Sequence, residues 1–203
     1  MRRLGLSDHG PVHFAIVSNI ALKILRNLLE ADVKPNIVTD HKMTNEDAEV
    51  VVFLGAVLHD VGKVGIPESI LNKSGPLNPE EWETMKTHVS FGGKLLEPLV
   101  PMARVRQMVL HHHEFFDGSG YPEALSGETI PLGARIITIA DSYDTITSDR
   151  SYKKGRTADE ALSELERCAN TQFDPKLVAA FVRAMRRLPN PLIEVASLLS
   201  RNL

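Results

Sequence analysis

The chain has 203 residues, 43% of them hydrophobic and 24% charged, which suits one globular domain with a real core and excludes a disordered chain. A formal net charge of −3 provides no general positive field, so we expect no binding of duplex nucleic acid through its phosphates. One cysteine excludes an internal disulfide, and no apolar run reaches the ~20 residues of a membrane span, so we expect a cytoplasmic protein without membrane contacts.

The spacing of apolar residues predicts helices from the N-terminal part onward. Residues 10–31 carry one apolar stripe with helical spacing. Thr44 and Asp47 resemble a capping box, and the helix that they start is apolar on every side, which predicts a central buried helix. The apolar run at 50–54 alone would also fit a strand, but the cap and the lack of a partner strand favour a helix.

Later helices are predicted by their first residues. Proline at the first helical position after a capping residue is a common helix start, and Thr157 with Glu160 forms another capping box. The three proline starts are Asn78-Pro79, Asp174-Pro175 and Asn190-Pro191. In the helix after Asn78, an apolar stripe runs from Trp82 to Leu96.

The remaining chain contains two more helical spans, 101–112 and 131–148, separated by an irregular Gly- and Pro-containing segment, 114–130. No segment alternates convincingly with the period of a strand. We therefore predict an all-α fold of eight or nine helices, forming a single domain over residues 1–203 with one long loop.

Carboxylates stand at positions that helical patterning turns inward. His59 and Asp60 end the most apolar helix, where an unpaired carboxylate would cost of the order of several kcal/mol. Asp141 lies in another apolar helix with Asp144 one turn further on the same side, and two buried acids repel unless they are neutralised. A metal ion is the simplest neutralising partner, although a single inward histidine such as His88 would by itself fit an ordinary hydrogen-bonded core residue.

Seven residues form the predicted ligand set: His13, His59, Asp60, His88, His112, His113 and Asp141. These five imidazoles and two carboxylates are too many for one four-coordinate zinc, so we expect at least two divalent ions. The mixed set without cysteine favours iron or manganese and also admits zinc and nickel. Two such ions suit phosphoester hydrolysis, with Asp60 as bridging carboxylate and Lys63, one turn further, near a phosphate oxygen.

Five motifs in this order resemble the HD-GYP branch of the HD phosphohydrolase superfamily over residues 57–182. They are HDVGK at 59–63, GIPESILNKSGPL at 65–77, His88, HHEFFDGSGYP at 112–122 and ADSYDTITSDRSYKK at 140–154. The resemblance implies an all-α domain that binds two or three metals, often iron or manganese. It also implies hydrolysis of the second messenger cyclic di-GMP to linear pGpG or to GMP.

The same resemblance implies residue roles. It makes His13 the first histidine of the superfamily, assigns the other six predicted ligands to the metals, and places Lys63 near the scissile phosphate. It implies that Arg150 and Lys153 contact the substrate, and these two stand in a local basic cluster that a dianionic dinucleotide requires. We add Asp144, Gly120, Tyr121 and Pro122 to the predicted substrate-binding residues.

The GYP loop, residues 114–130, is predicted to border the substrate cleft. Its glycines and Pro122 fix a turn, and Glu114 and Asp117 brace the loop or the ligands behind it. Tyr121 either stacks on a base of the substrate or supports the turn, while His111 precedes the motif and is expected to be a bystander.

The first part of the chain departs from the family pattern. His9 stands where trinuclear members carry a glutamate, so His9 is a candidate extra ligand and the metal number stays open at two or three. One alternative is a phosphohydrolase for another nucleotide or cyclic dinucleotide. Another is a catalytically weak module that binds a cyclic dinucleotide, or a protein partner through the GYP loop; a homodimer is also compatible with the sequence.

Overall fold

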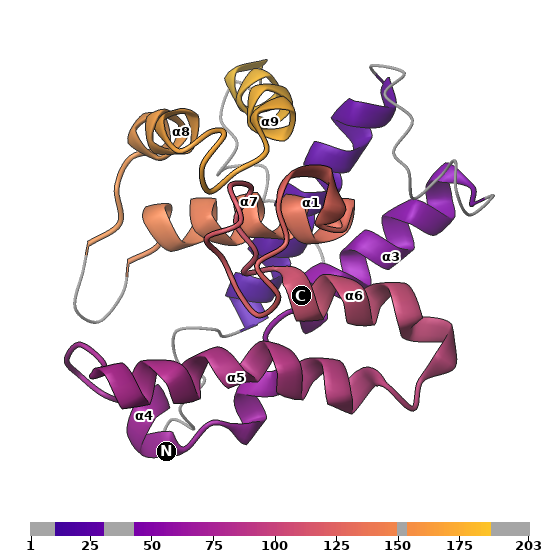
Figure 1. Ribbon diagram of the computed structural model, residues 1–203. Helices are drawn as coiled ribbons and strands as arrows, with labels where there is room; N and C mark the ends of the chain where they lie inside the picture. Colours follow the sequence, from indigo (N-terminus) through magenta and orange to yellow (C-terminus); the bar gives the residue numbers. More distant parts are fainter. Residues whose placement is uncertain (1–10, 31–42, 150–153, 188–203) are drawn as a thin grey trace.

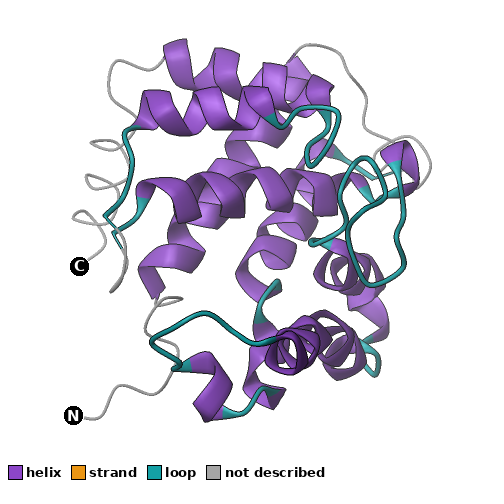
Figure 2. Cartoon of the chain, turned by 60° about the vertical axis from the view of Figure 1, so that its left-hand side comes forward, coloured by secondary structure: helices purple, strands orange, loops and turns teal. Residues whose placement is uncertain are grey.

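The computed structural model describes residues 11–30, 43–149 and 154–187 (Figure 1). Within these ranges the chain forms helices and loops and no strand (Figure 2). The only strand-like pairing there is an isolated bridge between Ala169 and Phe173. The all-α prediction is therefore confirmed. The prediction of a single domain over residues 1–203 stays a prediction.

Eight α-helices lie in the described ranges: α1 (Pro11–Glu30), α3 (Asn45–Leu58), α4 (Glu68–Leu71), α5 (Pro79–Leu96), α6 (Ala103–His111), α7 (Leu132–Thr147), α8 (Ala158–Arg167) and α9 (Pro175–Arg187). Three 3-10 helices accompany them: η1 (Val61–Gly65), η2 (Val100–Met102) and η3 (Gly127–Thr129). The predicted capping boxes at Thr44 and Thr157 are both present, and the predicted helix start at Asn78-Pro79 also has a capping box, formed with Glu81. The helix start predicted at Asn190-Pro191 lies outside the described residues.

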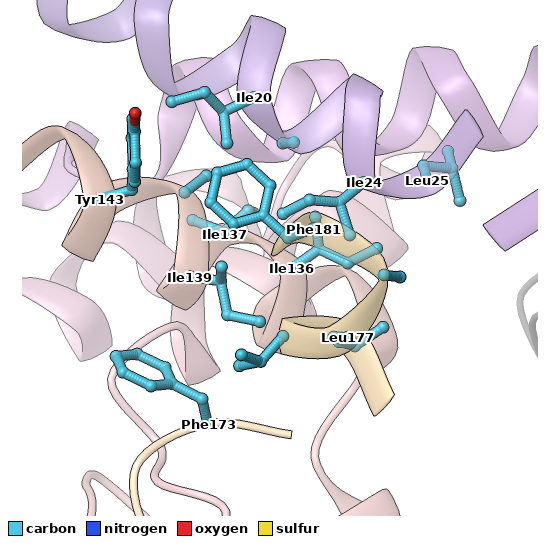
Figure 3. Packing of buried hydrophobic residues seen from close by; sticks show 14 of the residues in the cluster. Ile20, Ile24, Leu25, Ile136, Ile137, Ile139, Tyr143, Phe173, Leu177 and Phe181 are labelled. Carbon is cyan, nitrogen blue, oxygen red and sulfur yellow. The ribbon is translucent and has the colours of Figure 1, made fainter. Parts of the chain in front are cut away.

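The main core lies where α1, α7 and α9 meet. Ile24 of α1, Ile136 and Ile137 of α7 and Phe181 of α9 are fully buried there (Figure 3). By length and composition alone α1 would also be apolar enough to cross a membrane. Its apolar side is packed into this core, and that burial accounts for its composition.

The prediction that α3 is buried on every side is wrong. Ala48, Val52 and Ala56 face the core, but Val50 and Phe53 are 57% and 42% exposed. The neighbours of α3 are α1, α6 and α7, and they leave the side of the helix with Val50 and Phe53 exposed. Hydrophobicity around the whole helix therefore does not require burial around the whole helix.

A close contact between η1 and α5 sets the position of the site. A Cβ atom on Gly62 would lie 1.9 Å from the carbonyl oxygen of His88 and 2.5 Å from the backbone nitrogen of Gly92. Only glycine permits this approach of two backbones. The contact brings Asp60, the residue before η1, next to His88 on α5.

Candidate metal centre

Six of the seven predicted ligands form two compact groups. One group consists of His13, His59 and Asp60, and the other of His88, His112 and His113, and within each group the ligand atoms lie within 4.8 Å of one another. The residues come from α1, the end of α3, α5 and the end of α6. The fold thus brings together side chains that are up to 100 positions apart in the chain.

Asp60 lies between the two groups. Its Oδ2 is 3.3 Å from His59 Nε2, and its Oδ1 is 3.6 Å from His88 Nε2. One carboxylate oxygen therefore faces each group. This geometry is the one that a bridging carboxylate requires, and it supports the role that the sequence predicts for Asp60.

Asp141, the seventh predicted ligand, approaches from α7. Its Oδ1 is 3.6 Å from His13 Nε2 and 4.0 Å from His59 Nε2. The same Oδ1 is buried and has no hydrogen-bond partner in the part of the chain that the structure describes. A buried carboxylate oxygen without a donor is costly unless a cation meets it, so Asp141 fits a ligand of the first group.

Backbone contacts fix the imidazoles of His59, His88 and His112. In each, Nδ1 lies 2.7–2.8 Å from the carbonyl oxygen three residues earlier in the helix. A carbonyl only accepts, so Nδ1 carries the proton and Nε2 presents its lone pair. All three Nε2 atoms are buried and lack a hydrogen-bond partner within the described ranges, which is the state that metal ligands have before the metal binds.

His13 is oriented by an acid instead of a carbonyl. Its Nδ1 lies 2.6 Å from Asp144 Oδ2, and the hydroxyl of Ser148 donates to Asp144 Oδ1 at 2.8 Å. Asp144 is buried beneath His13, so this position supports a role in holding the ring more than the substrate contact that we predicted. The spacing of Asp141 and Asp144 is the signal that both acids face the site, but the sequence does not show which of them touches His13.

Burial and neighbouring charge set the protonation of the imidazoles. Burial, and then the adjacent imidazoles, hold the pKa of His112 well below its usual value and lower that of His113 to about 3. Burial also lowers the pKa of His88. In His59, burial works against the charged form, but the negative charges of Asp60 and Asp141 outweigh it and raise the pKa. The lowered pKa values keep His88, His112 and His113 neutral, and the acids beside His59 that favour its positive charge also suit a divalent cation.

Lys63 lies at the edge of this cluster. Its Nζ is 2.8 Å from Asp60 Oδ2, and its side chain is largely buried. An ammonium group beside the bridging carboxylate is well placed to meet a phosphate oxygen at the centre.

The backbone of the GYP loop approaches the centre closely. Gly118 has a φ of +85°, and a Cβ atom on Gly120 would lie 2.3 Å from the nitrogen of Phe115 and 2.5 Å from the oxygen of His113. The nitrogen of Tyr121 donates to the same His113 oxygen at 3.1 Å. The loop is therefore tied to the residue that supplies a ligand of the second group.

Acidic side chains stabilise the loop as the sequence predicts. The buried carboxylate of Glu114 accepts from the nitrogens of Glu123 at 2.7 Å and Leu125 at 3.1 Å. Asp117 accepts from the nitrogen of Ser119 at 2.9 Å and forms a local turn.

Tyr121 covers the second group. Its ring stacks on the imidazole of His113, with 5.0 Å between the centroids and 29° between the planes. Burial, together with Asp60 and Asp141, raises the pKa of the phenol, so the hydroxyl stays protonated. Of the two predicted roles, support of the turn agrees with this stacking. Pro122, the next residue, is exposed.

Several predicted residues take no part in the two groups. His111 is buried, but its Nε2 lies 3.1 Å from the side-chain oxygen of Gln107, which agrees with a bystander. His9, Arg150 and Lys153 lie outside the described residues, so their predicted roles stay predictions.

Comparison with known proteins assigns the fold and the centre to a family. A family model described as the HD domain matches residues 17–177, and this chain belongs to that family. Its motifs are those of the HD-GYP branch, named after His59-Asp60 and Gly120-Tyr121-Pro122. The expectation from sequence is thereby confirmed.

Curated relatives resemble the chain over part of their length. A cyclic di-GMP phosphodiesterase of Pseudomonas aeruginosa is 44% identical over 137 residues, which are 67% of this chain and 33% of the relative. A 3'3'-cGAMP-specific phosphodiesterase of Vibrio cholerae is 38% identical over 135 residues, 66% of this chain and 29% of the relative. The chain thus spans about a third of the length of these relatives.

Solved structures confirm the fold. An HDGYP protein of Bdellovibrio bacteriovorus superposes with a TM-score of 0.63 at 17% identity, covering 86% of this chain and 51% of that one. The HD domain of the phosphodiesterase PgpH from Listeria monocytogenes, in complex with cyclic-di-AMP, gives a TM-score of 0.53 at 14% identity and covers 97% of this chain and 95% of that one.

Proposed function

We propose that this chain is a metal-dependent phosphodiesterase that hydrolyses cyclic di-GMP to linear pGpG or GMP. The observation that carries the proposal is the convergence of two ligand groups on the two oxygens of Asp60. Each group is suited to hold one divalent ion, with Asp141 completing the first. Two divalent ions held by these residues would supply Lewis acidity and an activated water for attack on phosphorus.

The residues of the chain hold and orient the reactants. Asp60 fixes the spacing of the two groups, and Lys63 beside it neutralises charge on the phosphate in the transition state. Arg150 and Lys153 bind the phosphates or a guanine, while Gly120 and Pro122 shape the border of the cleft. Iron and manganese are the proposed metals because the ligands are imidazoles and carboxylates without a thiolate.

The substrate class rests on the relatives. Several of them are named cyclic di-GMP phosphodiesterases, and others are named as specific for 3'3'-cGAMP. These relatives are 38–44% identical over about two thirds of this chain, so a cyclic dinucleotide is the proposed substrate class. The proposal places the enzyme in the cytoplasm, where such messengers act, and leaves room for protein partners at the GYP loop and for a homodimer.

A reconstitution assay tests the proposal. The protein is loaded anaerobically with iron or manganese and incubated with cyclic di-GMP, 3'3'-cGAMP and cyclic di-AMP, and the products are separated by chromatography. We expect roughly two metals per chain and linear product from cyclic di-GMP. A protein that binds the dinucleotide without metal and without turnover would instead be the binding module considered above, and turnover of another dinucleotide alone would change the substrate.

A further inference from the structure

An aromatic side chain outside the ligand set stands at the rim of the centre. Trp82, on the second turn of α5, is 47% exposed although the sequence places it on the apolar stripe of this helix. Its ring contacts Tyr121 edge to face, with 6.4 Å between the centroids and 82° between the planes. Tyr121 in turn stacks on the imidazole of His113, so Tyr121 lies between Trp82 and that predicted ligand.

Several contacts hold Tyr121, the aromatic partner of Trp82, in place. Tyr121 is fixed by its backbone bond to His113 and by the stacking on that ring. The ammonium of Lys86 lies 5.8 Å from the centroid of the Tyr121 ring, on the same helix as Trp82. Six residues, about 9 Å of helix rise, separate Trp82 from the ligand His88 on α5, so the indole stands near the centre without being part of it.

The geometry leaves an indole surface for a ligand. An edge-to-face pair occupies at most one face of either ring, so the contact with Tyr121 leaves at least one face of Trp82 for another group. A cyclic dinucleotide held by its phosphate at the centre extends its bases outward from that phosphate. The flat, partly exposed ring beside the centre suits a purine, because base and indole stack through their π-faces.

We infer that Trp82 is a substrate-binding residue on which one purine base of the cyclic dinucleotide stacks. The inference rests on the proposed function and adds a residue to the binding site. Because every base has a π-face, stacking on Trp82 raises affinity without distinguishing guanine from adenine. Removing the indole is therefore expected to weaken the binding of cyclic di-GMP and of 3'3'-cGAMP by similar factors.

Replacements of different shape separate stacking from packing. Trp82→Leu keeps an apolar cover over Tyr121 but has no π-face, whereas Trp82→Phe keeps a smaller one. Binding is measured by calorimetry on the metal-loaded protein with a phosphorothioate analogue of cyclic di-GMP that resists hydrolysis. We expect Kd to rise about tenfold for Trp82→Leu and at most a few-fold for Trp82→Phe, with metal content unchanged in both.

A matched control lies on the same helix. Leu95 is 42% exposed and stands 13 residues beyond Trp82, about 20 Å along α5, so Leu95→Ala should leave Kd unchanged. The wild-type protein gives a second measurement, because Trp82 is the only tryptophan in the chain. Stacking should change its fluorescence in a saturable way as the analogue is added.

Two failures are distinguishable. If the loaded wild-type protein neither binds nor cleaves a cyclic dinucleotide, the proposed function fails and the inference fails with it. If the wild-type protein is active but Trp82→Leu binds as tightly as wild type, the proposed function stands and the stacking role of Trp82 is overturned. Equal weakening of binding in Trp82→Leu and Trp82→Phe would overturn it as well.

Discussion

Asp144 Oδ2 lies 2.6 Å from His13 Nδ1, at the end of the imidazole opposite to the atom that faces Asp141. The pair joins α7 to α1 and fixes the ring plane of His13. A carboxylate behind a metal-binding histidine typically contributes a factor of 10 to 100 in metal affinity. His13 thus depends on an acid that is 131 positions away.

The first prediction concerns this pair. Asp144→Asn keeps the size of the side chain but removes its charge, so the ion of the first group should bind about 10- to 100-fold more weakly. Calorimetric titration of the metal-free protein with the metal ion measures this affinity. Ser148→Ala removes only the hydroxyl that donates to Asp144 and serves as the mild control, with a smaller expected loss. Equal metal affinity in Asp144→Asn and wild type would refute the positioning role.

A second prediction concerns the contact of η1 with α5. Gly62→Ala puts a methyl group where the His88 oxygen lies 1.9 Å away, so the two backbones must separate and carry Asp60 away from His88. We expect a loss of about 1–3 kcal/mol in the free energy of unfolding together with weaker metal binding. Urea unfolding and metal analysis measure both. Gly75→Ala is the control, because nothing lies within 4 Å of a Cβ atom there.

The third prediction concerns Glu114. Glu114→Gln leaves one oxygen to accept, so one of the nitrogens of Glu123 and Leu125 loses its partner, at a cost of about 1–3 kcal/mol. Hydrogen exchange at these two amides should accelerate, while metal content stays near that of wild type. Asp117→Asn changes an exposed acid of the same loop and should have little effect on the two amides. Unchanged exchange in Glu114→Gln would show that the carboxylate does not brace the loop.

A fourth prediction separates charge from metal binding at Lys63. Lys63→Met removes the ammonium beside Asp60 but none of the seven predicted ligands. Turnover of cyclic di-GMP should fall at least tenfold, since stabilising charge on the phosphate is lost, while the metal content is kept. Steady-state kinetics and metal analysis on the same sample check this. Loss of metal in proportion to activity would make Lys63 a structural partner of Asp60 only.

The starts of α3, α5 and α8 could be predicted because each of these helices carries its own start signal. Capping boxes form within four residues at Thr44, Asn78 and Thr157. This start signal is local, so it can be recognised in the sequence without knowledge of the rest of the fold. The ligands could be predicted because an imidazole or acid on an apolar helical face is costly without a partner. His59 and Asp141 are of this kind.

Other features depend on distant parts of the chain. Asp144 contacts His13 because α7 crosses α1, and no local pattern indicates that contact. Trp82 lies on the apolar stripe of α5, but its side chain is 47% exposed. Val50 and Phe53 of α3 are likewise exposed. The hydrophobicity of a helix does not determine on how many of its sides other helices pack.

The most direct test of the two-ion centre is the metal stoichiometry of Asp60→Ala, measured by mass spectrometry beside its activity on cyclic di-GMP. Since each oxygen of Asp60 faces one ligand group, the substitution should lower the metal content from about two ions per chain and abolish turnover together. An Asp60→Ala protein that retains two ions and full turnover would contradict a centre organised around this carboxylate.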